Sequence, residues 1–338
     1  MNKKISWGLI GYGKFGKLIS QSFKEAKYAK LDCIASQTLN EEKINLGNCD
    51  IKVYKSYNKL IENKKIQNIY IATTNNLHKD LIIYSARNKK NIICEKPACM
   101  NVYDFNECLN EIKQNNVFFM EGLMYLHHPQ ISKTIQIIKD GTIGKILRIE
   151  ASFGYKVGKK FFFFELKKID KRSRLFNKKL GGGAIYDLGC YPLSAAILFL
   201  NIQNKNNNII SYKFYRNDGF YGVDENADCQ LTFQDGETAK LSVSIRRNLS
   251  NYIEIFGSKG KIKILTPWIT SKESKIELIT KKKNLYINTS LNRNIYAYEI
   301  DNASKAIISK KKEIEYPGAN FNLSLKYIKI MDEWKSYR

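Results

Sequence analysis

Short apolar runs alternate with helical patterns over the first third of the chain. The runs predict buried β-strands at residues 5–10, 31–36, 68–73, 91–94 and 117–120. Between them, apolar positions that recur every three or four residues predict helices at residues 15–27, at 79–88 and from 102 onward. Strands that alternate with helices are typical of a parallel sheet covered by helices. We therefore expect a doubly wound α/β domain over residues 1–121.

Beyond residue 121 the pattern changes to that of a half-buried sheet. Apolar and polar side chains alternate from Leu147 to Phe153, as they do in a strand with one buried face. Further strands are predicted at residues 239–246 and 252–256, and amphipathic helices at 129–139 and 323–337. We expect residues 122–338 to form a second α/β domain with a mostly antiparallel open sheet.

The composition is that of a globular protein with two domains. The chain has 338 residues, of which 43% are hydrophobic. No apolar run approaches the roughly 18 to 20 residues of a membrane span, and the N-terminus resembles neither a signal peptide nor an anchor. The seven cysteines form no CxxC pair, and adjacent His127 and His128 have no partner ligands. We therefore expect a cytoplasmic protein with reduced, mostly buried thiols, no metal and no membrane contact.

The formal net charge of +24 raises the question of an acidic partner. Lysine, asparagine and isoleucine are abundant along the whole chain, which indicates a general compositional bias. No nucleic-acid-binding motif accompanies the charge, so we expect no nucleic acid partner. One stretch stands out, because Lys156 to Lys179 contains ten Lys or Arg against Glu165 and Asp170. Such a run is usually solvated surface, but it could also attract an anionic substrate.

A glycine-rich turn lies between the first predicted strand and the first predicted helix. It reads Gly11-Tyr12-Gly13-Lys14-Phe15-Gly16, a GxGxxG spacing. In such turns the first glycine permits a tight bend, the second lets the backbone approach a pyrophosphate, and the third lets the helix pack on the strand. The strand before it and the helix after it favour a dinucleotide site over an ordinary turn. We assign the three glycines, Lys14 and Phe15 to that site.

The end of the second predicted strand bears on the choice between NAD and NADP. A carboxylate there binds the adenosine ribose and repels an added phosphate. Here the segment is Ala35-Ser36-Gln37-Thr38, and no carboxylate follows until Glu41. Ser36 and Gln37 can donate to a phosphate and so favour NADP, although the arginine typical of NADP sites is missing. The expected cofactor is NADP or NAD.

Further motifs carry a family resemblance. In chain order they are Ala72-Thr73-Thr74-Asn75-Asn76-Leu77-His78, Cys94-Glu95-Lys96-Pro97, Met120-Glu121-Gly122-Leu123-Met124-Tyr125, Gly141-Thr142-Ile143-Gly144-Lys145, Arg174-Leu175-Phe176-Asn177 and Leu180-Gly181-Gly182-Gly183-Ala184-Ile185-Tyr186-Asp187-Leu188-Gly189-Cys190-Tyr191-Pro192. In order and spacing they resemble the Gfo/Idh/MocA oxidoreductases over nearly the whole chain. The likeness is greatest to the branch of trans-dihydrodiol dehydrogenase and glucose-fructose oxidoreductase, which carries a tyrosine where inositol dehydrogenase-like members carry a histidine. Leu126 departs from this pattern, because many relatives in the branch have arginine there.

The resemblance implies hydride transfer between a nicotinamide and a secondary alcohol or carbonyl group. Such a reaction needs a general acid/base at the oxygen, and the resemblance gives this role to Tyr191. A tyrosine has a pKa of about 10, so a cation must favour the phenolate, and Lys96 matches the residue expected to supply it. Asp187 lies four residues before Tyr191, on the same face if the segment is helical, and is expected to orient the substrate.

The same resemblance places a further set of residues at the cofactor. These are Thr73, Thr74, Asn75, His78, Glu95, Lys96 and Pro97. Each assignment has a purely structural alternative: Lys96 could be a solvated lysine, Tyr191 a core aromatic residue and His78 a helix cap. A lysine directly after a buried strand and before proline, however, stands where α/β sheets bind their ligands.

Three functions remain open. The first is a dehydrogenase or reductase acting on a sugar, a polyol or a related compound, including an anionic one such as a sugar phosphate or nucleotide sugar. The second is a cofactor-binding sensor without catalysis, and the third, prompted only by charge, is a nucleic-acid-binding protein. The joint presence of Lys96, Asp187 and Tyr191 favours the first. The resemblance also implies a homodimer or homotetramer, while the substrate and the direction of the reaction stay open.

Overall fold

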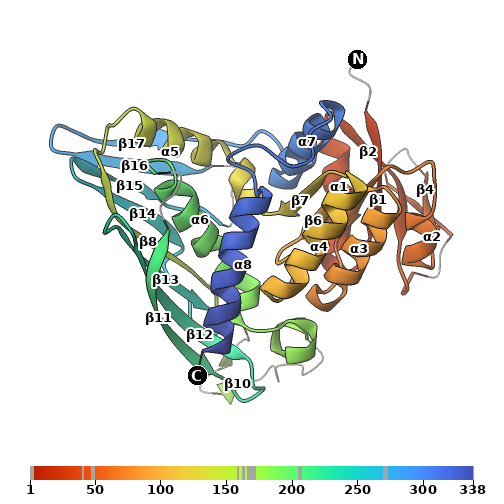
Figure 1. The fold of residues 1–338 in the computed structure, drawn as a ribbon, viewed down its shortest axis with the longest axis horizontal. Helices are drawn as coiled ribbons and strands as arrows, with labels where there is room; N and C mark the ends of the chain where they lie inside the picture. Colours follow the sequence, from red (N-terminus) through yellow and green to blue (C-terminus); the bar gives the residue numbers. More distant parts are fainter. Residues whose placement is uncertain are drawn as a thin grey trace. The chain divides into compact units, whose positions relative to one another are not determined.

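The computed structural model describes residues 4–39, 42–46, 50–157, 160–161, 164–165, 173–204, 208–268 and 273–337. The chain divides into two compact units, whose elements are labelled in Figure 1. Unit 1 comprises Met1–His128 and Asn292–Leu325, and unit 2 comprises Pro129–Leu291 and Lys326–Arg338. This division differs from the predicted single boundary after residue 121, because a late segment of the chain returns to unit 1.

A seven-stranded sheet forms the centre of unit 1. Its strands are β1 (Ile5–Ile10), β2 (Ala29–Ala35), β3 (Lys43–Asn45), β4 (Asp50–Tyr54), β5 (Asn68–Ile71), β6 (Asn91–Glu95) and β7 (Phe119–Gly122). They lie in the order β3-β4-β2-β1-β5-β6-β7, and every pair is parallel except β3 with β4. The predicted doubly wound sheet is confirmed. In such sheets ligands bind outside the carboxyl ends of the strands where the strand order reverses, here between β1 and β5.

The helices of unit 1 come from both ends of the chain. They are α1 (Lys14–Glu25), α2 (Tyr57–Ile61), α3 (His78–Arg87), α4 (Val102–Asn115) and α7 (Ile295–Ile308), with short 3-10 turns η1 (Asn75–Leu77) and η2 (Met124–His127) and the first turn of α8 (Phe321–Ser336). Ile300 and Ala303 of α7 belong to the same hydrophobic core as Trp7 of β1. The Trp7 indole also donates to Ser304 Oγ at 3.1 Å. These contacts explain why residues 292–325 are part of unit 1.

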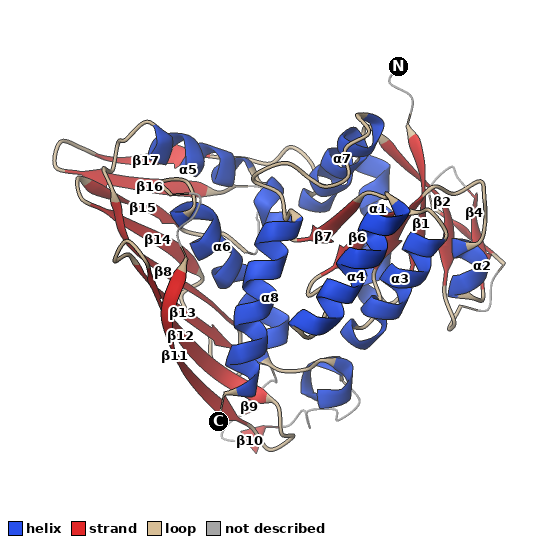
Figure 2. Ribbon diagram, in the orientation of Figure 1, coloured by secondary structure: helices blue, strands red, loops and turns tan. Residues whose placement is uncertain are grey.

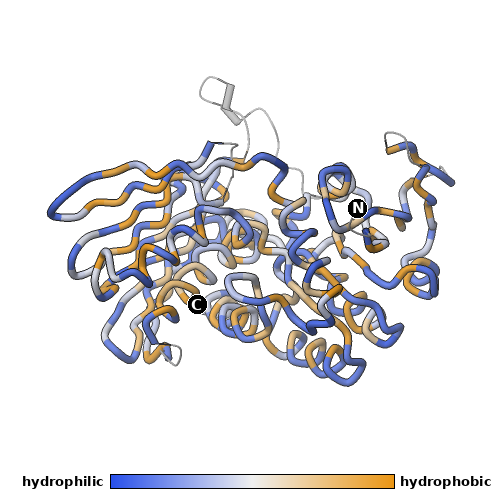
Figure 3. The backbone as a smooth tube through the Cα atoms, turned by 90° about the horizontal axis from the view of Figure 1, so that it is seen from above, coloured by the Kyte–Doolittle hydropathy of each residue, from blue (hydrophilic) through white to orange (hydrophobic). Residues whose placement is uncertain are grey.

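An eight-stranded sheet forms the centre of unit 2 (Figure 2). Its strands are β8 (Ile146–Gly154), β11 (Ile209–Asp218), β12 (Asp224–Phe233), β13 (Thr238–Ser244), β14 (Tyr252–Gly257), β15 (Gly260–Ile264), β16 (Lys275–Thr280) and β17 (Asn284–Asn288), and a separate pair is formed by β9 (Lys160–Phe161) and β10 (Phe164–Glu165). The order is β11-β12-β13-β8-β14-β15-β16-β17, and only β13 with β8 is parallel. The mostly antiparallel prediction is confirmed, and hydrophobic and hydrophilic residues alternate along many of these strands (Figure 3), as in a sheet with one covered face.

Helices of unit 2 pack on this sheet. They are α5 (Pro129–Lys139), α6 (Cys190–Leu200) and the later turns of α8, preceded by the turns η3 (Arg174–Phe176), η4 (Lys178–Leu180) and the π-helical η5 (Ile185–Gly189). α6 contacts β8 and β13, and α5 contacts β16. The helical stretch Lys178–Leu200 is long and apolar enough to cross a membrane by length and composition alone, which the sequence reading did not anticipate. Because 94% of its apolar window is buried within the protein, it also fits an ordinary core helix.

Two compositional expectations can be followed in the described residues. Six cysteines are buried thiols, namely Cys33, Cys94, Cys99, Cys108, Cys190 and Cys229. Cys49 and most of the basic stretch from Lys156 to Lys179 lie outside the described residues. Within the part of the chain that is described, no group of three or more His, Cys, Asp or Glu could hold a metal ion.

Candidate functional site

The glycine turn joins β1 to α1 in unit 1. Gly11 has a φ of +94°, and a Cβ atom there would lie 2.6 Å from the carbonyl oxygen of Ala72. A Cβ atom at Gly16 would overlap the carbonyl oxygen of Gly11. A Cβ atom at Gly13 would instead meet no atom within 4 Å. The first and third glycines are therefore required by the fold, whereas the space above Gly13 is open to a ligand.

The N-terminus of α1 adjoins this open space. Gly13 is its N-cap, no side chain caps the helix, and its first turn contains no acidic residue. The first N–H groups and the positive end of the helix dipole are thus available to an anion. Lys14 is exposed here, whereas the ring of Phe15 packs edge-on against Tyr296 of α7 at 5.4 Å. Lys14 is therefore open to solvent, whereas Phe15 packs against α7.

The loop after β2 presents hydroxyl and amide groups. Ser36 is 2% exposed, and its Oγ accepts the backbone N–H groups of Thr38 and Leu39, each at 3.3 Å. Gln37 is exposed. The Lys55 ammonium donates to the carbonyl oxygen of Leu39, which brings a cation to this loop. Ser36 therefore shapes the loop, while Gln37 and Lys55 are the groups that a ligand could reach.

His78 connects the loops that follow β5 and β6. It begins α3 and is fully buried, with Nδ1 2.8 Å from the carbonyl oxygen of Pro97 and Nε2 3.3 Å from that of Thr73. Thr74 is the N-cap of η1, and Asn75 is 5% exposed. His78 thus acts as a tie between two loops, which neither predicted role described. Since β1, β5 and β6 are parallel neighbours, the predicted cofactor residues on them share one edge of the sheet.

Glu95 ends β6, and Lys96 follows it. The Glu95 carboxylate accepts the Tyr70 hydroxyl at 2.6 Å and the Lys96 backbone N–H at 3.4 Å. Burial raises the pKa of Glu95 to about 7, against the opposing effects of the Tyr70 hydrogen bond and the Lys96 charge. Lys96 itself is half-buried. A carboxyl group that can titrate near neutrality therefore lies next to the predicted catalytic cation.

In unit 2, Asp187 is held on both carboxylate oxygens. Oδ2 accepts the Tyr155 hydroxyl at 2.7 Å, and Oδ1 accepts Arg174 Nη2 at 2.6 Å. Asp187 is 5% exposed, and burial, followed by the charge of Asp187, raises the pKa of Tyr155 above the usual tyrosine range. The carboxylate is thus fixed, and Tyr155 stays a neutral donor.

Tyr191 lies in the first turn of α6 and is 5% exposed. Its ring packs edge-on against Phe153 at 5.2 Å and tilted against Trp268 at 5.8 Å. Phe153 in turn lies 6.2 Å from Tyr155, the partner of Asp187. The structure therefore brings Asp187 and Tyr191 to the same end of β8. The segment that carries Asp187 is a π-helical turn, in which hydrogen bonds join residues five apart rather than the four used in the prediction.

The triple glycine and the end of α8 position this segment. A Cβ atom at Gly182 would lie 2.6 Å from the carbonyl oxygens of Arg174 and Leu175, and one at Gly183 would overlap Asp224. Asp224 accepts the Ile185 N–H at 2.6 Å and pairs with the Lys335 ammonium. The side chains of Asp224 and Lys335 are 0% and 14% exposed. A buried ion pair thus anchors the turn that carries Asp187.

Comparison with known proteins decides the family. Residues 5–123 match the family described as "Oxidoreductase family, NAD-binding Rossmann fold", and residues 131–263 match the "GFO/IDH/MocA C-terminal domain". The chain belongs to the Gfo/Idh/MocA oxidoreductases. The predictions of this family and of an NAD(P)-dependent oxidoreductase are confirmed.

This Gfo/Idh/MocA protein is similar to several dehydrogenases and reductases in sequence or in structure. The chain is 28% identical over 319 residues to trans-1,2-dihydrobenzene-1,2-diol dehydrogenase of Xenopus tropicalis, covering 91% of this chain and 90% of the relative. A solved 3-ketoreductase from Actinomadura kijaniata, in complex with NADP and TDP-benzene, has a TM-score of 0.83 at 21% identity, covering 98% and 96%. An aldose-aldose oxidoreductase from Caulobacter crescentus has a TM-score of 0.84 at 20% identity, with the same coverage. The two structures show a common fold.

Sequence reasoning missed several contacts of this oxidoreductase. Tyr155 lies two residues beyond the predicted strand 147–153, and Arg174 belongs to one of the motifs, but neither was assigned a role. Lys335 gave no signal, because a lysine near the end of an amphipathic helix is normally solvated. Leu126, the departure from the family pattern, is 1% exposed, and its apolar side chain cannot make the polar contacts of an arginine.

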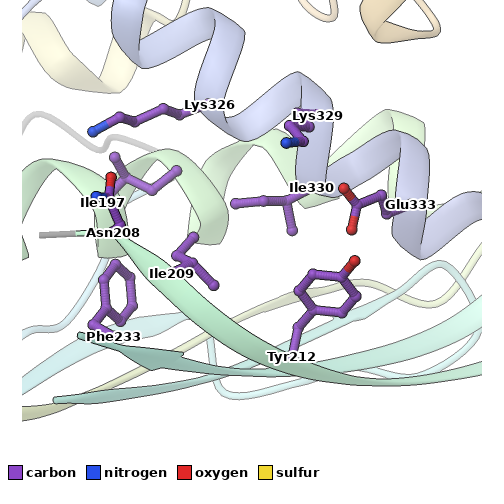
Figure 4. A pocket seen from close by; sticks show the side chains of 9 residues that line it. All are labelled: Ile197, Asn208, Ile209, Tyr212, Phe233, Lys326, Lys329, Ile330 and Glu333. Carbon is purple, nitrogen blue, oxygen red and sulfur yellow. The ribbon is translucent and has the colours of Figure 1, made fainter. Parts of the chain in front are cut away.

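A pocket of about 390 Å³ lies elsewhere in unit 2 (Figure 4). It has an apolar floor below two lysines and is lined by Ile197, Asn208, Ile209, Tyr212, Phe233, Lys326, Lys329, Ile330 and Glu333. None of the residues predicted from the sequence lines it. We therefore build no catalytic role on it.

Proposed function

We propose that this oxidoreductase transfers hydride between NADP(H) or NAD(H) and a secondary alcohol or carbonyl group of a sugar, polyol or sugar derivative. The observation that carries the proposal is the buried Asp187, held on both oxygens in the same short segment as Tyr191. A buried carboxylate reduces stability unless it is paired, so its presence beside the buried Tyr191 favours a chemical role for the two residues.

In this proposal each residue has one task. The bound nicotinamide supplies or accepts the hydride. Tyr191 donates its hydroxyl proton to the substrate oxygen during reduction and takes it back during oxidation. Lys96 binds the substrate hydroxyl and the cofactor ribose, and its charge favours the tyrosine phenolate. Asp187, fixed by Tyr155 and Arg174, orients the substrate.

The proposed cofactor is NADP. Gln37 and Lys55 bring an amide and a cation to the loop after β2. Within the described residues 36–39 of that loop there is no carboxylate to repel a phosphate. The presence of NADP in the Actinomadura kijaniata ketoreductase supports the same choice. Glu41 lies outside the described residues.

For the substrate we propose a sugar-like compound that can be anionic. The named relatives act on a dihydrodiol or are described as a ketoreductase and an aldose oxidoreductase, and the ketoreductase holds a nucleoside diphosphate derivative. The net charge of +24 suits an anionic molecule. A homodimer or homotetramer stays a prediction of the family resemblance.

The first test measures cofactor binding by fluorescence titration with NADPH and, separately, with NADH. We expect saturable binding that favours NADPH and is lost in Gly13→Val, a variant that should fold normally because a Cβ atom there meets no neighbour. Oxidation of NADPH is then screened with sugars, polyols, dihydrodiols, sugar phosphates and nucleotide sugars. Absence of binding to folded protein contradicts the proposal, and binding without turnover on any of them favours a cofactor sensor.

A further inference from the structure

A buried hydrogen-bonded chain joins Tyr70, Glu95 and Glu299 in unit 1. The Tyr70 hydroxyl lies 2.6 Å from Glu95 Oε1 and 3.1 Å from Glu299 Oε2. Tyr70 and Glu299 are fully buried, and Glu95 is 8% exposed. Tyr70 belongs to β5, Glu95 ends β6 and Glu299 lies on α7. The carboxyl groups of Glu95 and Glu299 thus share the Tyr70 hydroxyl, and Glu95 directly precedes Lys96 in the chain.

Counting hydrogens shows how this chain is satisfied. A tyrosine hydroxyl carries one hydrogen and can donate to only one of the two carboxyl groups. The distance of 2.6 Å to Glu95 is that of a hydroxyl that donates to a charged carboxylate. The Tyr70 oxygen must then accept from Glu299, and a carboxyl group donates only when it is protonated. The chain is therefore complete when Glu299 holds a proton.

The surroundings of the two carboxyl groups agree with this assignment. Glu95 Oε2 has the Lys96 N–H as a second donor, and the Lys96 charge lowers the pKa of Glu95. Glu299 Oε1 has no hydrogen-bond partner among the described residues. Burial, and then the charge of Glu95, raise the pKa of Glu299 well above its usual range. A buried oxygen without a donor costs much less on a neutral carboxyl group than on a carboxylate.

Two further ionisable residues, Tyr296 and Glu121, interact with the Tyr70–Glu95–Glu299 hydrogen-bonded chain. Tyr296, on α7, has a pKa that burial and the two carboxyl groups raise, so it stays neutral. Glu121, on β7, accepts the Ala98 N–H at 2.7 Å and the Ser324 hydroxyl at 2.6 Å, and its charge raises the pKa of Glu95. The positive charge of Lys96 lowers the pKa of Glu95 and so opposes the effect of Glu121.

We propose that Tyr70 and Glu299 are positioning residues for Lys96. Glu299 donates its proton to the Tyr70 oxygen, Tyr70 donates its hydrogen to Glu95, and Glu95 carries the negative charge that holds the Lys96 ammonium in place. The proton stays within the chain, so Glu299 acts only through its neighbours. This inference rests on the proposed function, in which Lys96 contacts cofactor and substrate.

The location of the proton can be measured without cofactor or substrate. Infrared difference spectra at about pH 9, where Glu95 with its pKa of about 7 is ionised, are taken as wild type minus Glu299→Gln and should contain the C=O band of a protonated carboxylic acid. Wild type minus Glu95→Gln should show the loss of carboxylate bands instead. The reverse assignment, or no acid band in either spectrum, overturns the proposal. Circular dichroism checks that each variant is folded.

The effect of Tyr70 and Glu299 on Lys96 is measured by the pH dependence of cofactor affinity. The cofactor used is NADPH or NADH, whichever binds the wild type more tightly. Affinity should fall as Glu95 becomes protonated. Tyr70→Phe removes a hydrogen bond to the charged form and should move this midpoint upward by about one pH unit. Tyr84→Phe is the matched control, because its hydroxyl bonds Glu62 at the exposed surface, and should leave the midpoint in place.

The Glu299→Gln variant distinguishes a neutral from a charged Glu299. Its amide can still donate to Tyr70, so the midpoint should stay within about 0.3 pH units of wild type. If Glu299 is instead charged, removing that charge relieves repulsion on Glu95 and moves the midpoint downward, which overturns the proposal. An unmoved midpoint in Tyr70→Phe also overturns it. If neither cofactor binds, the proposed function fails, while the infrared spectra still locate the proton.

Discussion

The candidate cofactor loops of unit 1 and the Asp187–Tyr191 region of unit 2 are built in different ways. In unit 1 the backbone determines the shape: Gly11 and Gly16 allow close approach, and the uncapped start of α1 offers N–H groups. In unit 2 side chains from distant segments determine it, since Tyr155 and Arg174 both hold Asp187. A backbone site can be recognised from local spacing, whereas a side-chain network requires the fold. The two designs should also respond differently to substitution.

The largest expected effect separates chemistry from cofactor binding. Tyr191→Phe removes the proposed acid/base and should lower kcat/KM by about 10² to 10⁴, while the Kd for NADPH stays within about twofold of wild type. Lys96→Met should lower kcat/KM similarly and also weaken NADPH binding. Steady-state kinetics on the substrate found by the screen, with fluorescence titration, checks both. Full turnover by Tyr191→Phe would remove the tyrosine from the mechanism.

The next effect concerns the anchor of the unit 2 segment. Lys335→Met leaves the fully buried Asp224 carboxylate without its cation and should lower the free energy of unfolding by about 3 to 5 kcal/mol. Lys311→Met, which breaks the exposed pair with Glu315, should cost less than about 1 kcal/mol. Urea unfolding of the two variants gives the comparison. Equal losses would mean that the buried pair is no special support for this turn.

A smaller effect tests Lys55, the cation at the loop after β2. Lys55→Ala should raise the Kd for NADPH by about fivefold, because an exposed lysine and a phosphate attract each other by about 1 kcal/mol. The Kd for NADH, which lacks that phosphate, should change by less than about twofold. Titration with both cofactors measures the ratio. An equal change for the two would show that Lys55 only supports the loop.

The last prediction concerns the histidines, His78, His127 and His128, which all belong to unit 1. Burial lowers the pKa of His127 to about 4, whereas an unfolded histidine has a pKa of about 6.5. The unfolded chain thus gains a proton first, and the stability that neutral His127 contributes is lost as the pH falls from about 6.5 to about 4.

His127→Asn should therefore show its largest stability deficit above pH 6.5. Its side-chain oxygen can accept from Asn302, as His127 Nδ1 does at 3.0 Å, so the fold should be kept. The deficit in thermal unfolding should shrink as the pH falls toward about 4. A deficit that is constant with pH would mean that folding does not shift the pKa of His127.

The sequence predicted elements well where burial followed hydrophobicity and failed where polar groups are buried. The strand at residues 5–10 and the helix at 129–139 have the bounds that the pattern gave. β7 extends to Gly122 rather than ending at Met120, because buried Glu121 satisfies its carboxylate with Ala98 and Ser324. Helix α7 was not predicted at all, since its buried Glu299 and Asp301 interrupt the apolar stripe.

The candidate site follows the same rule. The three glycines and Lys96 could be found from spacing and position relative to strands. The partners of Asp187 could not, because their meeting depends on a turn at Gly182 and on a strand end near Tyr155. The Lys335–Asp224 pair joins residues far apart in sequence, and no local pattern encodes such a pair.

The return of the chain to unit 1 bears on how the protein is made. Synthesis proceeds from the N-terminus, and many proteins fold their first domain while the rest is still being translated. Here the core of unit 1 lacks Ile300 and Ala303 until α7 has left the ribosome, and unit 2 lacks Lys335 until α8 follows. Unit 1 therefore completes its core only after the sheet of unit 2 has been synthesised, and unit 2 gains its buried ion pair only after α7 of unit 1.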